Sequence, residues 1–161
     1  VLVALEELDR RLQNGAPHPL AGPGSVHASL IEGGQEMSSI PARCLLVGER
    51  RTIPGETVEL VEQELRDIAG GANVRVIAAR EPYQALLEHP FVELAVRAAG
   101  GLEPVGAPFW TDAALIAAAG IPTVLYGPAG AGAHAEEEWV DLASLVRLRE
   151  VVLQVAAEWC A

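Results

Sequence analysis

Paired glycines place the strongest limit on what this chain can form, because they break it into short segments that each have room for a single helix or strand. Glycine pairs stand at 33–34, 70–71 and 100–101, and Asn14-Gly15 adds another turn signal near the N-terminus. Between these breaks, apolar residues recur either at helical spacing or in short strand-like runs. The sequence therefore predicts several short helices and strands joined by turns.

The first half of the chain predicts an α+β arrangement. The expected elements, in order, are a helix that ends at Asn14-Gly15, strands at 25–31 and 42–48, a helix that Thr57 caps, and a strand at 73–79. The first two strands are expected to pair as neighbours. This order lacks only a leading strand to complete a split βαβ sandwich, so we expect that strand to have been cut off.

The character of the sequence changes near residue 82, where Ala, Gly and Pro become dense and helical segments alternate with strand-like ones. The expected elements are helices at 91–99, 112–119 and 142–159 and a short buried strand at 122–126. We therefore expect two parts, residues 1–81 and residues 82–161, with an α/β fold class for the second part.

The charge of the chain excludes one class of partner. Eleven basic residues, all of them Arg, stand against 22 acidic residues, for a formal net charge of -11. Because such an acidic chain repels phosphate backbones, nucleic acid is not an expected partner.

The sequence does not predict a membrane protein, since no apolar run approaches the roughly 20 residues of a membrane span. Charged residues right after the apolar start also argue against a signal peptide. The chain begins at Val1, in what looks like the middle of a helix, which predicts a truncated chain. Cys44 and Cys160 lie far apart and match neither a zinc spacing nor a disulfide framework, so we expect a reducing cytoplasm.

The segment from Gly127 to Val140 carries the clearest indication of chemistry. It follows a short apolar strand, as the ligand-binding loops of open α/β folds do, and its glycines let a backbone approach a ligand closely. His134 lies at the far end of this loop, where its imidazole is a candidate zinc ligand that Glu138 could orient. Two other interpretations stay open: an ordinary polar residue in a flexible loop, and a phosphate loop, although no Lys follows the glycines.

Three motifs together give the whole chain a resemblance to a known family. They are IEGGQEMSSIPARC followed by ERRTIPGE, then FWTDAALIAAAGIPTVLYGP, then AHAEEEWV. In order and spacing they resemble the C-terminal part of the M20 family of metallo-aminohydrolases and peptidases, a group that includes deacetylases, desuccinylases and aminoacylases.

The resemblance implies a fold and a metal centre. Residues 1–81 would be a βαββαβ lid or dimerisation domain without its first strand. Residues 82–161 would be the C-terminal part of a zinc-peptidase-like α/β catalytic domain. The intact enzyme would hold two metal ions, usually zinc and otherwise cobalt or manganese, bridged by a carboxylate and a water. His134 resembles the C-terminal metal ligand, whereas the other ligands and the general base belong to the preceding half, so no catalytic residue is expected within this chain.

The resemblance also suggests an arginine that binds substrate. Arg51 matches a lid arginine whose guanidinium fork grips a substrate carboxylate. The adjacent Arg50 competes for that role, and Arg51 beside Glu49 and Glu56 would equally suit an ordinary surface charge.

The other candidate substrate contacts are Ser38, Thr111, Asp112 and Gly127. Ser38 stands where many relatives of the family carry Asn. Thr111 and Asp112 match a family turn that lines the substrate pocket, although Thr followed by Asp is also a plain helix N-cap pair.

We therefore expect part of a di-zinc hydrolase that cleaves the amide bond of N-acyl amino acids or short peptides. Its partners would be a small-molecule substrate and a second copy bound through the lid domain, and the isolated chain would be inactive. Two alternatives stay open: a non-catalytic dimerisation or interaction module, and a nucleotide-binding domain that uses the GPAGAG loop.

Overall fold

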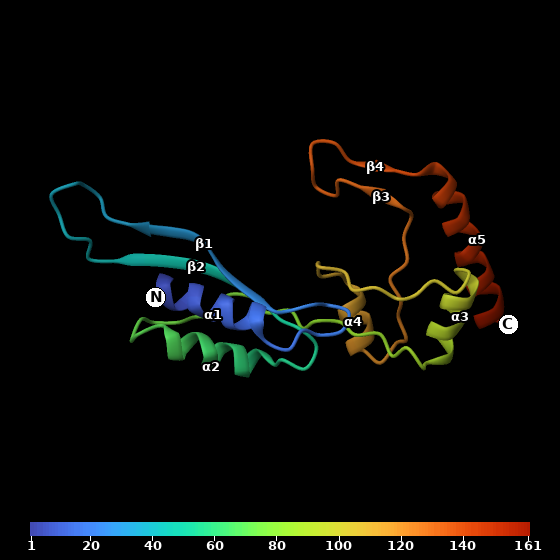
Figure 1. Cartoon of the computed structure of the whole chain (residues 1–161), viewed down its shortest axis with the longest axis horizontal. Helices are drawn as coiled ribbons and strands as arrows, with labels where there is room; N and C mark the ends of the chain where they lie inside the picture. Colours follow the sequence, from blue (N-terminus) through green and yellow to red (C-terminus); the bar gives the residue numbers. More distant parts are fainter. The chain divides into compact units, whose positions relative to one another are not determined.

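The computed structural model describes residues 1–161, which form five helices and two small sheets (Figure 1). The elements are α1 Leu2–Asn14, β1 Ser25–Gly33, β2 Cys44–Arg51, α2 Val58–Ile68, α3 Pro90–Ala98, α4 Ala113–Ala118, β3 Gly130–Ala131, β4 Trp139–Val140 and α5 Leu142–Trp159. The expected mixture of helix and sheet is confirmed. None of the five helices combines the length and the apolar character that a membrane span requires.

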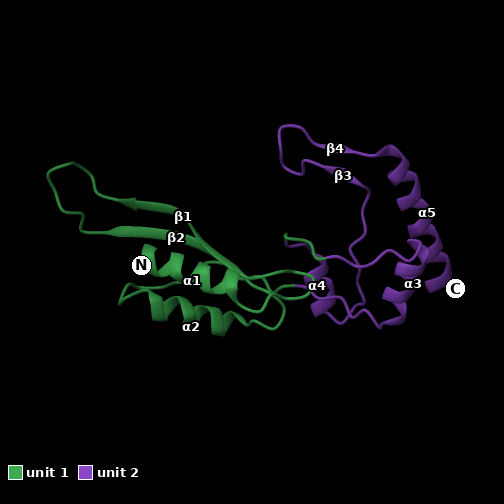
Figure 2. Cartoon of the chain, viewed as in Figure 1, with its two compact units in different colours: residues 1–82, 106–109 green, residues 83–105, 110–161 purple.

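The chain divides into two compact units (Figure 2). Unit 1 contains residues 1–82 and 106–109, and unit 2 contains residues 83–105 and 110–161. Segment 106–109 joins unit 1 through a close backbone approach, because a Cβ at Gly106 would collide with the carbonyl group of Leu20. Unit 1 therefore includes a short piece of chain from well beyond residue 82.

The sheet of unit 1 is an antiparallel hairpin of β1 and β2. Pairing runs from Ser25 opposite Arg51 to Gly33 opposite Cys44, so the two predicted strands do lie side by side. Ser29 is an extra residue in β1, where the register shifts, and its hydroxyl donates to the Val47 carbonyl at 3.3 Å. Along a strand, side chains point alternately to the two faces of the sheet. The extra residue of a bulge interrupts this alternation, so the residues of β1 before and after Ser29 do not follow one continuous pattern.

Helix α1 is fastened to the first residues of β1. Leu8 is buried, and the carboxylate of Asp9 accepts the backbone N–H of Val26 at 2.9 Å. The amide of Gln13 also donates to the carbonyl of Gly24, at 3.3 Å. Helix α1 thus forms one hydrogen bond with β1 and a second with Gly24, the residue just before that strand.

Helix α2 begins where the sequence predicts. The Thr57 hydroxyl accepts the backbone N–H of Leu60 at 3.3 Å, which confirms the predicted N-cap. A tight turn precedes it, closed by the hydrogen bond from the Glu56 N–H to the Ile53 carbonyl at 3.1 Å. Gly55 has φ 97°, a conformation that favours glycine, so the turn brings the chain directly from β2 into α2.

Unit 2 is organised around the contact of α3 with α5. The ring of Phe91 lies edge-on to that of Trp159, with their centroids 5.1 Å apart, and Val92, Leu94 and Val151 are buried. Both helices were predicted, as was α4, whose helical stretch is shorter by one residue at each end.

Two predicted strands, at 73–79 and at 122–126, are wrong. Both segments lack a partner strand, and an isolated apolar run has no ladder of hydrogen bonds to make it a strand. In segment 122–126 the carbonyl of Thr123 accepts a hydrogen bond from the hydroxyl of Tyr83, and so its partner is a side chain and not the backbone of a neighbouring strand. Burial raises the pKa of Tyr83 above its ordinary value.

Replacing the α2 cap tests the local basis of unit 1. Thr57→Ala is expected to lower the free energy of unfolding by about 1 kcal/mol, because one backbone N–H at the helix start loses its acceptor. Thr57→Ser keeps the hydroxyl and is expected to stay within about 0.5 kcal/mol of the parent. Urea unfolding followed by circular dichroism measures both, and equal losses in the two variants would contradict the capping role.

Candidate functional site

The six predicted site residues divide between the two units. Arg51 and Ser38 lie in unit 1, and Thr111, Asp112, Gly127 and His134 lie in unit 2. Each unit therefore carries its own set of candidate residues.

His134 lies in the turn of the hairpin that joins β3 to β4 in unit 2 (Figure 1). Gly130 pairs with Val140 and Ala131 with Trp139, so the hairpin presents His134 beyond its paired residues. The residue has φ 65°, and it is the one non-glycine residue of the chain in that left-handed region. A side chain held in this conformation carries strain that the hairpin must offset, and such strain is concentrated at functional positions.

The structure does not gather further candidate metal ligands around His134. No group of three or more His, Cys, Asp or Glu side chains in residues 1–161 lies close enough to hold a metal ion. Protein zinc sites take three or four ligands. The residues present thus offer one candidate ligand, His134, and do not form a metal site by themselves.

The glycines around His134 have a backbone role. A Cβ at Gly130 would collide with the carbonyl of Trp139, and one at Gly132 with the carbonyl of Glu137. The GPAGAG segment therefore leads into a hairpin whose strands approach closely, and not into the helix N-terminus that cradles phosphate. Gly127 differs, because a Cβ there would meet nothing within 4 Å, so packing does not require a glycine at that position.

In unit 1 the two adjacent arginines have opposite surroundings. Successive residues of a strand face opposite sides of the sheet. The side chain of Arg50 is 2% exposed and binds Glu56 at 2.5 Å and Glu64 at 3.1 Å, whereas that of Arg51 is 57% exposed. From the sequence, Arg50 and Arg51 were competing candidates. The alternation of faces along a strand was the signal that could have separated the buried arginine from the accessible one.

The contacts of Arg51 are those of an accessible cation. Its Nε donates to the Glu49 carboxylate at 2.8 Å and its Nη1 to the Pro108 carbonyl at 3.2 Å. The ion pair is open to solvent, and an exposed pair of this kind contributes only about 0–1 kcal/mol. A carboxylate ligand would therefore displace Glu49 at small cost.

Ser38 lies in the loop between β1 and β2, where serine hydroxyls surround an acidic side chain. The hydroxyl of Ser39 and then that of Ser38 donate to the Glu36 carboxylate, and both bonds hold its pKa below the ordinary value. Ser38 thus already has a partner on its own loop.

Thr111 and Asp112 precede α4 in unit 2. Asp112 occupies the N-cap position without a side-chain capping hydrogen bond, and the backbone carbonyls of Thr111 and Asp112 accept the first helical N–H groups. Asp112 therefore stands at the N-cap of α4, but its carboxylate does not cap the helix by a hydrogen bond.

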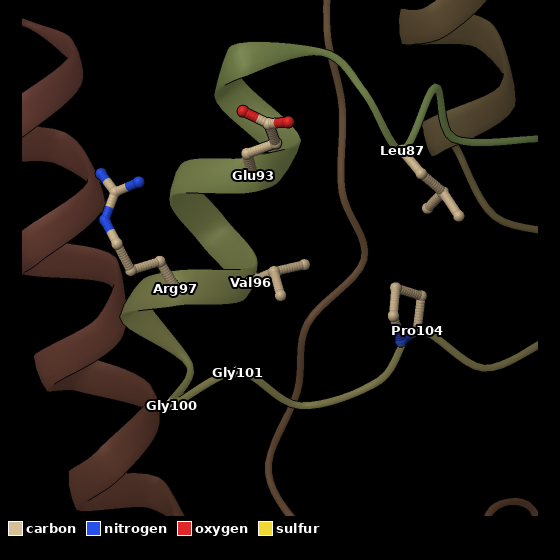
Figure 3. Close-up of a pocket in the computed structure, with 7 residues that line it drawn as sticks. All are labelled: Leu87, Glu93, Val96, Arg97, Gly100, Gly101 and Pro104. Atoms are coloured by element: carbon tan, nitrogen blue, oxygen red, sulfur yellow. The ribbon is translucent and has the colours of Figure 1, made fainter.

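A pocket of about 620 Å³ in unit 2 contains none of the six candidates (Figure 3). Its lining residues are Leu87, Glu93, Val96, Arg97, Gly100, Gly101 and Pro104. Leu87, Val96 and Pro104 give it an apolar floor, and Arg97 is paired with Glu158 at 3.1 Å. The pocket brings together no set of groups that suits hydrolysis.

Comparison with known proteins covers nearly the whole chain. Residues 3–158 match peptidase family M20/M25/M40. The chain is 29% identical over 168 residues to an acetylornithine deacetylase of Myxococcus xanthus, covering 98% of this chain and 43% of that protein.

Two further relatives agree with this match. A protein of Mycobacterium tuberculosis that carries the name succinyl-diaminopimelate desuccinylase is 32% identical over 124 residues, covering 74% of this chain and 34% of its own length. An N-formyl-4-amino-5-aminomethyl-2-methylpyrimidine deformylase of Bacillus subtilis is 26% identical over 191 residues, covering 100% of this chain and 45% of its own length. The chain thus spans less than half the length of the curated relatives it matches.

Removing each arginine in turn separates the buried cation from the accessible one. Arg50→Met is expected to lower the free energy of unfolding by about 3 kcal/mol, because two largely buried carboxylates lose their partner. Arg51→Met is the matched control and should change it by less than about 0.5 kcal/mol. Denaturant unfolding measures both, and similar losses would contradict the assignment of the two arginines to opposite faces.

Relief of the strain at His134 gives a second test. His134→Gly is expected to be more stable than His134→Ala by about 1 kcal/mol, because glycine adopts a positive φ without the steric cost of a Cβ. Thermal unfolding of the two variants measures the difference. An alanine variant as stable as the glycine variant would show that residue 134 does not adopt the left-handed conformation.

Proposed function

Because the chain belongs to peptidase family M20/M25/M40, we propose that it is part of a metal-dependent hydrolase that cleaves the amide bond of N-acyl amino acids or short peptides. The match over residues 3–158 is the observation that carries this proposal. The names of two relatives, a deacetylase and a deformylase, also describe removal of an acyl group.

His134 is the residue through which this chain would take part in metal binding. Its position in the turn between β3 and β4, outside the paired residues, supports a role as one imidazole ligand. A metal pair, taken as zinc with cobalt or manganese as alternatives, needs further ligands that residues 1–161 do not gather. The isolated chain should therefore be inactive.

Substrate contacts are proposed for each unit separately. Arg51 would bind a substrate carboxylate, supported by its exposure and by its weak surface pair with Glu49. Gly127 would let its backbone approach the ligand, since no neighbouring atom requires a glycine there. Thr111 and Asp112 would line the pocket, and Ser38 would have to exchange its bond to Glu36 for one to the substrate.

The same proposal assigns a role to each part of the chain. Residues 1–81 would form a lid that also mediates a homodimer, and residues 82–161 would form the C-terminal part of the catalytic domain. Cys44 and Cys160 are unpaired and exposed, which supports a reducing, cytoplasmic location.

Metal removal from the gene's full-length product tests this proposal. Hydrolysis of a panel of N-acetyl amino acids, N-succinyl amino acids and dipeptides should stop after dialysis against EDTA and return with zinc, cobalt or manganese. His134→Ala should lower both the metal content and kcat/KM. Loss of a residue that only orients a metal ligand costs about 10–100-fold, and loss of the ligand itself should cost more.

His27→Ala is the matched control, because His27 is an exposed histidine on β1 and should leave metal content and kcat/KM unchanged. Hydrolysis that is indifferent to metal removal, or a His134→Ala enzyme with full metal content and rate, would refute the proposal.

A further inference from the structure

The guanidinium of Arg50 holds both ends of the segment that carries Arg51. Its Nη1 donates to the backbone carbonyl of Arg51 at 2.5 Å and to the Glu56 carboxylate at 3.2 Å. Its Nη2 donates to the other oxygen of Glu56 at 2.5 Å, which makes the pair bidentate. Arg50 therefore connects the last residue of β2 to the turn that follows it.

Glu56 is fixed in turn by the backbone of the same segment. Its carboxylate accepts the N–H of Ile53 at 2.8 Å, and its own N–H donates to the Ile53 carbonyl. Residues 51–56 thus form a closed loop in which the carboxylate of Glu56 is the common acceptor. A change at Glu56 would release the backbone next to Arg51 without touching the Arg51 side chain.

The site around Arg50 is built for that guanidinium. Gly24 faces it, and a Cβ at position 24 would lie 2.7 Å from Nη1 of Arg50. The side chains of Glu56 and Glu64 are only 19% and 25% exposed. Glu64, on α2, accepts from Nε of Arg50 at 3.1 Å and so anchors the guanidinium to that helix.

Arg51 depends on its backbone for orientation, because few contacts hold its side chain. These are the solvent-exposed ion pair with Glu49 on β2 and one hydrogen bond to the carbonyl of Pro108 at 3.2 Å. A long, exposed arginine loses rotamer freedom when it grips a ligand, so a fixed backbone reduces the cost of binding. A misplacement of about 1 Å at a binding group can lower the rate by about 100-fold.

We propose that Arg50 and Glu56 are positioning residues that set the orientation of Arg51 for a substrate carboxylate. This inference rests on the proposed function of Arg51 and adds a specificity element to it. The pair acts through the backbone of residues 51–56, and neither side chain contacts the substrate.

The experiment compares two probes in the gene's full-length product: the N-acyl amino acid of the panel that is turned over fastest, and its primary amide, which lacks the carboxylate. Glu56→Gln is nearly isosteric and should raise KM for the acid about 10-fold, with kcat and the KM for the amide unchanged. Glu62→Gln is the matched control, because it removes a carboxylate of α2 that pairs with Arg66 and not with Arg50, and it should leave both KM values unchanged. Arg50→Lys keeps the charge but loses the two-pronged guanidinium, and it should have the same effect on KM as Glu56→Gln. It therefore serves as the second test should Glu56→Gln fold poorly.

Non-additivity with Arg51 completes the test. Arg51→Met should itself raise KM for the acid alone, and adding Glu56→Gln to it should have no further effect. The positioning role is wrong if Glu56→Gln and Arg50→Lys change neither KM, or change the KM of both probes equally. The proposed function still stands in that case, provided that Arg51→Met raises KM for the acid alone. If Arg51→Met leaves KM for the acid unchanged, the carboxylate role of Arg51 is wrong, and the positioning role falls with it.

Discussion

The buried guanidinium of Arg50 is the interaction on which unit 1 depends. It ties the end of β2, the turn at Ile53–Glu56 and helix α2 to one another through two carboxylates and one backbone carbonyl. A buried ion pair adds little net stability compared with apolar packing, but removing one of its partners is costly. The cluster therefore fixes the geometry of this segment more than it strengthens the fold, and that geometry is what places Arg51 at the surface.

In unit 2 the hairpin of β3 and β4 depends on a constraint of a different kind, the close approach of its two backbones. Gly130 and Gly132 permit that approach, and His134 accepts a left-handed conformation at the turn. His134 is exposed, so burial of its side chain does not account for the left-handed conformation. Under the proposed function, unit 1 would contribute the carboxylate-binding side chain of Arg51, and unit 2 would contribute the imidazole of His134.

The sequence predicted those features that depend on neighbours along the chain. The cap at Thr57, the hairpin of β1 and β2 and helix α5 follow from local chemistry and periodicity, and all are present. The strands at 73–79 and 122–126 failed because a strand also needs a partner, which a run of apolar residues does not reveal. In the same way, the motifs shared with the M20 family indicated Arg51 and His134 as candidates, whereas the burial of Arg50 and the positive φ of His134 emerge only from the folded backbone.

The central claim is that His134 supplies one ligand to a metal centre whose other ligands come from outside these 161 residues. Anomalous X-ray diffraction from crystals of the gene's full-length product, grown with zinc, tests it most directly. The account predicts a zinc peak at about 2.0–2.1 Å from an imidazole nitrogen of His134. A fully occupied metal centre with the His134 side chain in solvent would contradict it.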